Sequence, residues 1–274
     1  MKSLSQILSY ILPFLYLGVI FLYYLIFTGK KKNPGINTAM ALAILLIIHA
    51  VEIITRNIAL RTTPMSTAHD AFSFLAFSIL FVYMIIELSL KNKGSGIFLL
   101  TLAFVFELFS IFNMSWEPET NPLLANPTFA IHASLSVMGY TAMAISAIYA
   151  LMYIIQNRNI KRHYHGKLFS QLPAITFLEK MSIRSVTIGM ILLGIGILLG
   201  HIEAKRMIGS FMPNDIKVIV TDLVWLIYLI GILLARVMRW RGRWMAYFAL
   251  AGFVILILGA VLLVYLFESF HKFS

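Results

Sequence analysis

The sequence predicts an all-α, polytopic membrane protein with about eight transmembrane helices, and three observations support this fold class. Of the 274 residues, 60% are hydrophobic and only 12% are charged, whereas soluble domains carry about 25% charged residues. The mean hydropathy is +0.89. The apolar residues come in blocks of roughly 20, and at about 1.5 Å per residue each block can cross a hydrocarbon core about 30 Å thick.

The first apolar block has no small-residue cleavage site and is followed by Lys30, Lys31 and Lys32, so we expect a retained helix and not a signal peptide. Residues 168–181 follow a basic stretch with apolar side chains near helical spacing, which predicts a helix in the cytoplasmic interface. The predicted spans are residues 6–28, 37–58, 70–90, 96–113, 129–155, 185–203, 216–237 and 244–268.

We expect one transmembrane domain over residues 1–274. The first four helices and an external loop fall in 1–128, and the last four helices fall in 129–274. The external loop covers 113–128, which contains no lysine or arginine.

The distribution of cations indicates how the helices are oriented. Lysine and arginine are concentrated in alternate loops, at residues 30–32, 91–93, 158–167, 180–184 and 236–243. The positive-inside rule places these loops in the cytoplasm and both termini outside. The net charge of +11 therefore indicates orientation in a lipid membrane and not binding to nucleic acid.

The chain contains no cysteine. This excludes disulfides, zinc–thiolate sites, iron–sulfur clusters and covalent haem attachment through a CxxCH motif within this chain. The sequence also offers no nucleophile–base pair and no nucleotide-binding loop.

Five of the seven histidines fall on the outer side of this topology. His49 lies inside the second span, about 15 Å deep, and His69, His132, His201 and His271 lie at or near span ends. Because haem iron is often held by one or two imidazoles, this grouping predicts a haem or metal site. The alternative is that these rings only occupy the membrane interface, where a polar aromatic group costs little.

The second span carries the least expected polar residues. His49, Glu52 and Arg56 follow one another at spacings of three and four, on one helical face. Burying such groups in lipid costs at least a few kcal/mol, so they should face a cavity or one another. A structural network joining helices is the alternative to a functional site. Glu107 is a similar intramembrane acid with no partner that the sequence can assign.

Small residues predict where two of the helices approach closely, because they let backbones come together in lipid. In each of these two helices the small residues form a row that leads to an outer histidine. We therefore predict that His132 and His201 lie near each other. The small residues are Ala133, Ser134, Ser136, Gly139, Ala142 and Ser146 in the fifth span, and Gly189, Gly194, Gly196 and Gly200 in the sixth.

The second half of the chain contains a distinctive order of motifs. The stretch from residue 172 reads LPAITFLEKMSIRSVTIGMILLGIGILLGHIEAK. It is followed by Gly209, Ser210, Asp215, Lys217, the run WLIY at 225–228, RWRGR at 239–243 and Gly252-Phe253. This order resembles the cytochrome c assembly family of CcsA-, CcmC- and HemX-type haem-handling membrane proteins. The first half, with His49 in LLIIHAVEI, is most similar to the HemX-type branch.

The resemblance implies a non-covalent haem b site outside the membrane. In the family, an outer histidine before a Ser–Tyr helix and a C-terminal outer histidine are understood as the axial ligands. His132 in IHASLSVMGYTAM and His271 in FESFHKF match these two positions. Asp215 and Lys217 would then shape the external cover together with Gly209.

The resemblance also implies a context for the site. His201 and His49 are second choices as cofactor-binding residues, the latter on an entry route from the bilayer. The implied partners are haem, a second membrane subunit that carries the thiol chemistry, and an apocytochrome. The implied location is a bacterial or archaeal cytoplasmic (inner) membrane, with the site on its outer side. The implied role is that of a haem chaperone or transport component more than that of a catalyst.

The chain departs from the family pattern in its external motif, and this departure favours an alternative function, that of a regulatory or scaffold protein of haem or respiratory-complex assembly with a degenerate site. A third function is that of a bis-histidine electron-transfer protein. It needs two histidines at matching depth on facing helices, and only His132 with His201 or His271 qualifies. Glu203, Ile208, Met212, Asn214 and Val220 stand where the family tends to have aromatic residues, and Leu233 or Leu234 stands where it has an intramembrane histidine.

Overall fold

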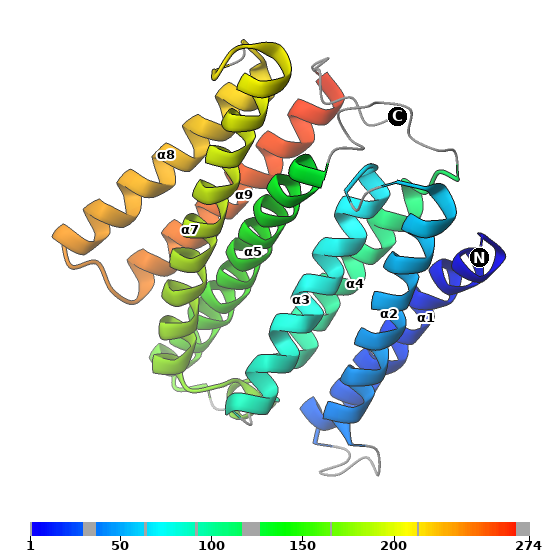
Figure 1. The fold of residues 1–274 in the computed structure, drawn as a ribbon. Coiled ribbons are helices and arrows are strands. Elements are labelled where there is room, and N and C mark those ends of the chain that lie inside the picture. Colours follow the sequence, from blue (N-terminus) through cyan, green and yellow to red (C-terminus); the bar gives the residue numbers. More distant parts are fainter. Residues whose placement is uncertain are drawn as a thin grey trace. The chain divides into compact units, whose positions relative to one another are not determined.

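The computed structural model describes residues 2–29, 37–62, 65–90, 93–116, 127–164, 166–212 and 214–266, and these residues form helices joined by turns. They fall into two compact units (Figure 1). The N-terminal unit comprises residues 1–130 with 165–173, and the C-terminal unit comprises 131–164 with 174–274. Residues 117–126 of the predicted external loop, and His271, lie outside the described residues.

The N-terminal unit is a bundle of four long helices, in which α1 and α3 each pack on both α2 and α4. The short helix α6, Lys167–Gln171, also belongs to this unit. The four long helices are α1 (Lys2–Phe27), α2 (Thr38–Leu60), α3 (Ala68–Leu90) and α4 (Gly96–Phe112).

Local capping determines where the helices of this bundle begin. The side chain of Asn37 accepts a hydrogen bond from the backbone nitrogen of Ala39 at 3.1 Å and caps α2. At α3, the Thr67 hydroxyl accepts from the backbone of Asp70, and the Asp70 carboxylate accepts from the backbone of Thr67. This reciprocal pair is a capping box, and it satisfies two of the backbone donors that a helix start leaves unpaired.

The exterior of the helices is apolar. Phe14, Ile47 and Phe112 are 73%, 62% and 81% exposed, whereas Glu52 and Arg56 are 1% exposed. Apolar side chains outside and charged ones inside are the arrangement that a lipid solvent requires. Among the described residues, six helices are long and apolar enough to span a membrane, and α4 and the 243–256 part of α9 are shorter apolar helices. The predicted polytopic helical membrane protein is confirmed.

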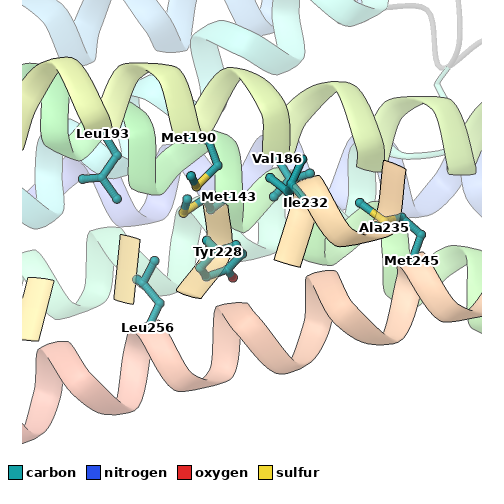
Figure 2. Packing of buried hydrophobic residues seen from close by; sticks show 9 residues of the cluster. All are labelled: Met143, Val186, Met190, Leu193, Tyr228, Ile232, Ala235, Met245 and Leu256. Atoms are coloured by element: carbon teal, nitrogen blue, oxygen red, sulfur yellow. The ribbon is translucent and has the colours of Figure 1, made fainter. Parts of the chain in front are cut away.

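The C-terminal unit contains four long helices and an apolar core cluster (Figure 2). Helix α7 packs on α8 and α9, which also pack on each other. A Cβ atom at Gly139 would lie 2.9 Å from the Cβ of Leu193, so α5 and α7 approach closely there. The helices are α5 (Pro127–Lys161), α7 (Ile175–Ile208), α8 (Ile216–Val237) and α9 (Arg243–Leu266). The cluster comprises Met143, Val186, Met190, Leu193, Tyr228, Ile232, Ala235, Met245 and Leu256.

One predicted boundary is wrong. The span predicted to start at 185 begins at Ile175, so residues 175–181 belong to α7 and only 167–171 form a separate helix. The charged residues Lys180 and Arg184 suggested an end to the apolar span, but both are exposed on the outside of a continuous helix. Leu178, Ser182 and Ser185 continue its buried face without a break.

Candidate functional site

His132 lies near the start of α5 and faces α7. Its Nδ1 atom is 2.6 Å from the carbonyl oxygen of Gly196. Since a carbonyl oxygen only accepts, Nδ1–H is the donor, and this fixes the tautomer in which Nε2 carries the lone pair. A metal-ligating histidine commonly donates its other ring N–H to a backbone carbonyl in this way.

A glycine makes room for the His132 ring. A Cβ atom at Gly200 would lie 2.6 Å from Cε1 of His132 and 2.9 Å from its Nδ1. Real Cβ atoms do not approach so closely, so any larger residue at 200 would displace the ring. Because His201 follows Gly200 directly, the rows of small residues bring the two outer histidines to adjacent positions of α5 and α7.

His201 is tied to the chain through both ring nitrogens. Nδ1 is 2.9 Å from the carbonyl oxygen of Phe211, and Nε2 is 3.1 Å from Oδ2 of Asp222. The Phe211 ring also stacks on the imidazole, with centroids 5.3 Å apart. Both partners are acceptors, so a ring nitrogen that carries a proton can donate to the partner it faces. In this arrangement His201 pairs with a carboxylate and positions the segment after α7.

The segment between α7 and α8 holds the predicted cover residues. Gly209 ends α7 with a left-handed φ of 75°, and its N–H donates to the Lys205 carbonyl. The side chain of Asp215 is buried directly before α8, and Lys217 lies in the first turn of that helix. Because His271 lies outside the described residues, its pairing with His132 stays a prediction.

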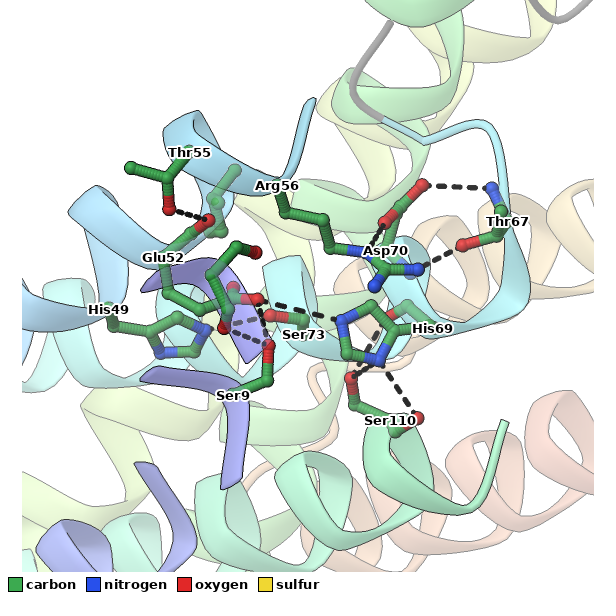
Figure 3. A network of polar contacts seen from close by, with 12 residues as sticks. Ser9, His49, Glu52, Thr55, Arg56, Thr67, His69, Asp70, Ser73 and Ser110 are labelled. Atoms are coloured by element: carbon green, nitrogen blue, oxygen red, sulfur yellow. Dashed lines mark hydrogen bonds and ion pairs between the residues drawn. The ribbon is translucent and has the colours of Figure 1, made fainter. Parts of the chain in front are cut away.

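The N-terminal unit contains a second polar assembly, centred on His49 in the interior of the bundle (Figure 3). Its Nδ1 is 3.0 Å from the Tyr16 hydroxyl, and its Nε2 is 2.8 Å from the Ser73 hydroxyl. Oε2 of Glu107 lies 3.6 Å from the same Nε2. His49 therefore contacts side chains of α1, α3 and α4 from its place on α2, and Glu107 is its neighbour on α4.

Glu52 and His69 form the next part of this assembly. The Ser9 hydroxyl donates to Oε1 of Glu52 at 2.6 Å, and Nε2 of His69 lies 3.9 Å from the same oxygen. Nδ1 of His69 is 3.0 Å from the Ser110 carbonyl, to which it donates. A cavity of about 10 Å³ is lined by Glu52, His69 and Arg56, and its size and polar lining suit one water molecule.

Arg56 completes the outer end of the assembly. Its Nε donates to Oδ1 of Asp70 at 3.0 Å, and its Nη2 donates to the Ser115 carbonyl at 2.7 Å. The guanidinium carbon lies 4.7 Å from the centre of the Trp116 ring, which adds a cation–π contact. The buried cation is thus compensated by a carboxylate, a carbonyl and an aromatic face.

A further polar cluster lies toward the other end of the same bundle. The Tyr23 and Tyr83 hydroxyls both donate to Oε2 of Glu87, and the Thr38 hydroxyl donates to its Oε1 at 2.7 Å. All four side chains are buried. A Cβ atom at Gly96 would lie 2.3 Å from the Tyr83 oxygen, so the absence of a side chain there makes room for the cluster.

Within the described residues, no group of three or more histidine, cysteine, aspartate and glutamate side chains is arranged to hold a metal ion. Haem needs fewer protein ligands, because the macrocycle supplies four nitrogens and the protein supplies only the axial positions.

The profile of the family described as "Cytochrome C assembly protein" matches residues 65–271. The chain belongs to the cytochrome c assembly protein family. The matched region includes α3 to α9, and so it contains His132, His201 and the segment between α7 and α8.

Individual relatives agree with this membership. The protein named cytochrome c biogenesis protein CcsA in Prochlorococcus marinus is 24% identical, and the match covers 88% of this chain and 87% of that protein. CcsA of Microcystis aeruginosa is also 24% identical, over 70% of this chain and 73% of the relative. Protein HemX of Brevibacillus brevis is 30% identical over 40% of this chain and 43% of the relative. The expected resemblance is confirmed.

Sequence reasoning missed several residues of this family member. Three of them are polar residues of α1 that hydrogen-bond inside the bundle, namely Ser9, Tyr16 and Tyr23. Their spacing of seven places them on one helical face, and in an otherwise apolar span this spacing could have predicted a buried polar face. Asp222 was missed because nothing in its neighbourhood indicates that it faces His201.

Proposed function

We propose that the chain acts in cytochrome c biogenesis by holding haem non-covalently at the outer face of the membrane. His132 and His271 would be the axial ligands, and haem would be cargo that is bound and handed on. The observation that supports this most strongly is the hydrogen bond from His132 Nδ1–H to the Gly196 carbonyl. It orients the ring and keeps the proton on Nδ1, which is the arrangement of a histidine that binds a metal through Nε2.

The other predicted site residues have supporting parts in this proposal. The His201–Asp222 pair would hold the segment after α7 next to the His132 ring. Asp215 and Lys217, at the start of α8, would form the cover together with Gly209. His49 would belong to an entry route from the bilayer and not to the outer ligand pair. We propose non-covalent haem b as the form bound, because the chain has no cysteine for a thioether bond.

The proposed location is the cytoplasmic (inner) membrane of a bacterium or archaeon, with the haem on its outer side. Attachment of haem to an apocytochrome requires reduced thiols on that apocytochrome, and this chain contains no cysteine that could take part in thiol chemistry. We therefore propose a second membrane subunit as the partner that supplies this chemistry, with the apocytochrome as acceptor.

A regulatory or scaffold role in haem or respiratory-complex assembly is the second candidate function. The engagement of His201 with Phe211 and Asp222 favours it, because that histidine is held by protein groups and not presented to a ligand. In this case the protein would act in assembly without carrying haem.

Haem content and cytochrome maturation separate the two functions. The protein, His132→Ala and the control His163→Asn would each be expressed in cells that lack the native gene. The control changes an exposed histidine of the basic loop at a left-handed φ of 52°, which asparagine tolerates. We expect His132→Ala to lose both co-purified haem and mature c-type cytochrome, and His163→Asn to keep both. Normal maturation by His132→Ala would contradict haem handling and support the scaffold role.

A further inference from the structure

The turn between α8 and α9 forms one side of a pocket whose other side is α7. Its volume is about 260 Å³, and its lining includes Thr187 of α7 and Trp240 of the turn. The floor is apolar, because Ile232, Ala235 and Met245 are buried in the core cluster of the C-terminal unit (Figure 2). The pocket lies entirely within this unit, on the side that the cation distribution predicts to be cytoplasmic.

Three arginines belong to the lining of this pocket. Arg236 lies in the last turn of α8, and Arg239 and Arg241 belong to the turn between α8 and α9. All three are exposed, and within the described part of the chain no ion pair joins any of them to an acid. Glu179 lies near the turn, and its Oε1 accepts from the backbone nitrogen of Gly242 at 2.7 Å. The pocket lining itself contains three arginines and no acid, so the pocket keeps a net positive charge.

Backbone hydrogen bonds hold the turn in a defined shape. The Trp240 nitrogen donates to the Ala235 carbonyl at 2.8 Å, and the Arg239 nitrogen donates to the Arg236 carbonyl at 3.2 Å. Arg239 and Gly242 adopt left-handed φ values of 52° and 62°. Together with the Glu179 anchor to α7, these features present the guanidinium groups from a fixed scaffold and not from a long loop.

The position of the pocket matches the headgroup level of a membrane. Trp240 and Trp244 lie side by side with ring centroids 6.5 Å apart, and tryptophan is enriched at membrane–water interfaces. Below them, α8 and α9 continue as apolar helices. A ligand in this pocket would thus have an anionic part among the arginines and an apolar part along the helices.

We propose that this pocket is a binding site for an anionic phospholipid, whose phosphate is held by Arg236, Arg239 and Arg241 and whose acyl chains pack on the apolar floor. Guanidinium groups bind phosphate oxygens through paired, charge-assisted hydrogen bonds. Basic pockets between helices on the cytoplasmic side are a recognised way to bind acidic headgroups. A bound lipid would hold the α8–α9 turn against α7. This site is independent of the proposed haem site.

The full chain, purified in detergent and stripped of lipid, provides the test. Binding of phosphatidylglycerol and of phosphatidylcholine with identical acyl chains would be measured by native mass spectrometry, for the protein and for the double variant Arg236→Gln/Arg241→Gln. Arg158→Gln is the control, because it removes an exposed cation from the same predicted side of the membrane but outside the pocket. Unfolding temperatures measured with phosphatidylcholine alone would show that all variants remain folded.

We expect the protein and Arg158→Gln to bind phosphatidylglycerol in preference to phosphatidylcholine. We expect the double variant to bind phosphatidylglycerol at least about tenfold more weakly, as the loss of two charge-assisted contacts implies. Equal binding of the two lipids, or unchanged binding by the double variant, would overturn the proposal. Competition by inorganic phosphate at the same concentration as the lipid would also overturn it, because the site would then bind a soluble anion.

Discussion

At the residue scale, the N-terminal unit pairs its ionisable side chains inside an apolar exterior. Arg56 faces Asp70, His49 faces Glu107 and His69 faces Glu52. In the Arg56–Asp70 pair, each charged group brings a cost of desolvation that its partner offsets only when the geometry is retained. Removing one member of this pair should therefore lower the free energy of unfolding more than removing a neutral residue of the same region.

Asp70→Asn tests this pairing. The substitution leaves the Arg56 cation without its carboxylate, and loss of one partner of a buried pair costs about 3–5 kcal/mol. Thr67→Ala is the matched control, since it removes only the hydroxyl of the same capping box, at about 1 kcal/mol. Unfolding in mixed micelles would measure both free energies. Equal losses would show that Asp70 acts only as a helix cap.

Gly200→Ala tests the placement of the His132 ring. The new Cβ would lie 2.6 Å from Cε1 of His132, so the ring must move and its hydrogen bond to the Gly196 carbonyl must weaken. We expect haem binding to weaken at least about tenfold, equivalent to about 1.4 kcal/mol. Gly18→Ala is the control, because no atom lies within 4 Å of a Cβ built there. Unchanged haem affinity in Gly200→Ala would contradict the role of His132.

At the element scale, small residues let α5 and α7 approach closely beside the apolar cluster that contains Met143 and Leu193. A Cβ built at Gly189 would lie 2.9 Å from the carbonyl oxygen of Gly139, and the Ser146 hydroxyl donates to the Ser182 carbonyl at 2.8 Å. Lipid chains are as apolar as leucine, so close backbone contact is what favours helix association over contact with lipid.

Gly139→Ala tests the α5–α7 contact. Its Cβ would lie 2.9 Å from both the Cβ and the backbone nitrogen of Leu193, and backbone atoms cannot move aside as a flexible side chain can. Overpacking of this kind costs about 1–3 kcal/mol. We expect Gly139→Ala to lower the unfolding temperature and Gly18→Ala to leave it unchanged, both measured in the same detergent. An unchanged unfolding temperature for both variants would contradict the close contact between α5 and α7.

The helices were predictable as elements, but their ends and inward faces were less so. Apolar length alone predicts the spans, because lipid requires it. It does not locate the start of α7, where Lys180 and Arg184 lie on the outside of a helix that begins at Ile175. The spacing of His49, Glu52 and Arg56 predicts one polar face, whereas the partners Tyr16, Ser73 and Ser110 depend on how the helices pack, which one span does not reveal.

At the scale of the whole molecule, the net charge of +11 is best understood through topology. The cations of alternate loops predict which ends of the helices face the cytoplasm. The same distribution assigns His132 and His201 to the outer side and the arginine-lined pocket to the inner side. The locations of both proposed binding sites therefore depend on the same predicted orientation of the chain in the membrane. Because the chain has no native cysteine, single introduced cysteines can test this orientation.

Single cysteines would report this orientation. Met212→Cys lies after α7 and Tyr164→Cys lies in the basic loop after α5, and the native side chains are 70% and 63% exposed. We expect a membrane-impermeant maleimide to label Met212→Cys in intact cells, and Tyr164→Cys only after the cells are permeabilised. The native chain is the blank because it contains no cysteine. The reverse labelling pattern would place the haem site in the cytoplasm.

The outer haem site is the central claim, and the visible absorption spectrum of the purified protein, oxidised and dithionite-reduced, tests it most directly. The spectrum would be recorded beside those of His132→Ala, His271→Ala and His163→Asn. We predict a sharp reduced-state haem spectrum that is lost in the first two variants and retained in the third. A protein that stays colourless after haem is added, or a spectrum that survives in His132→Ala, would contradict the account.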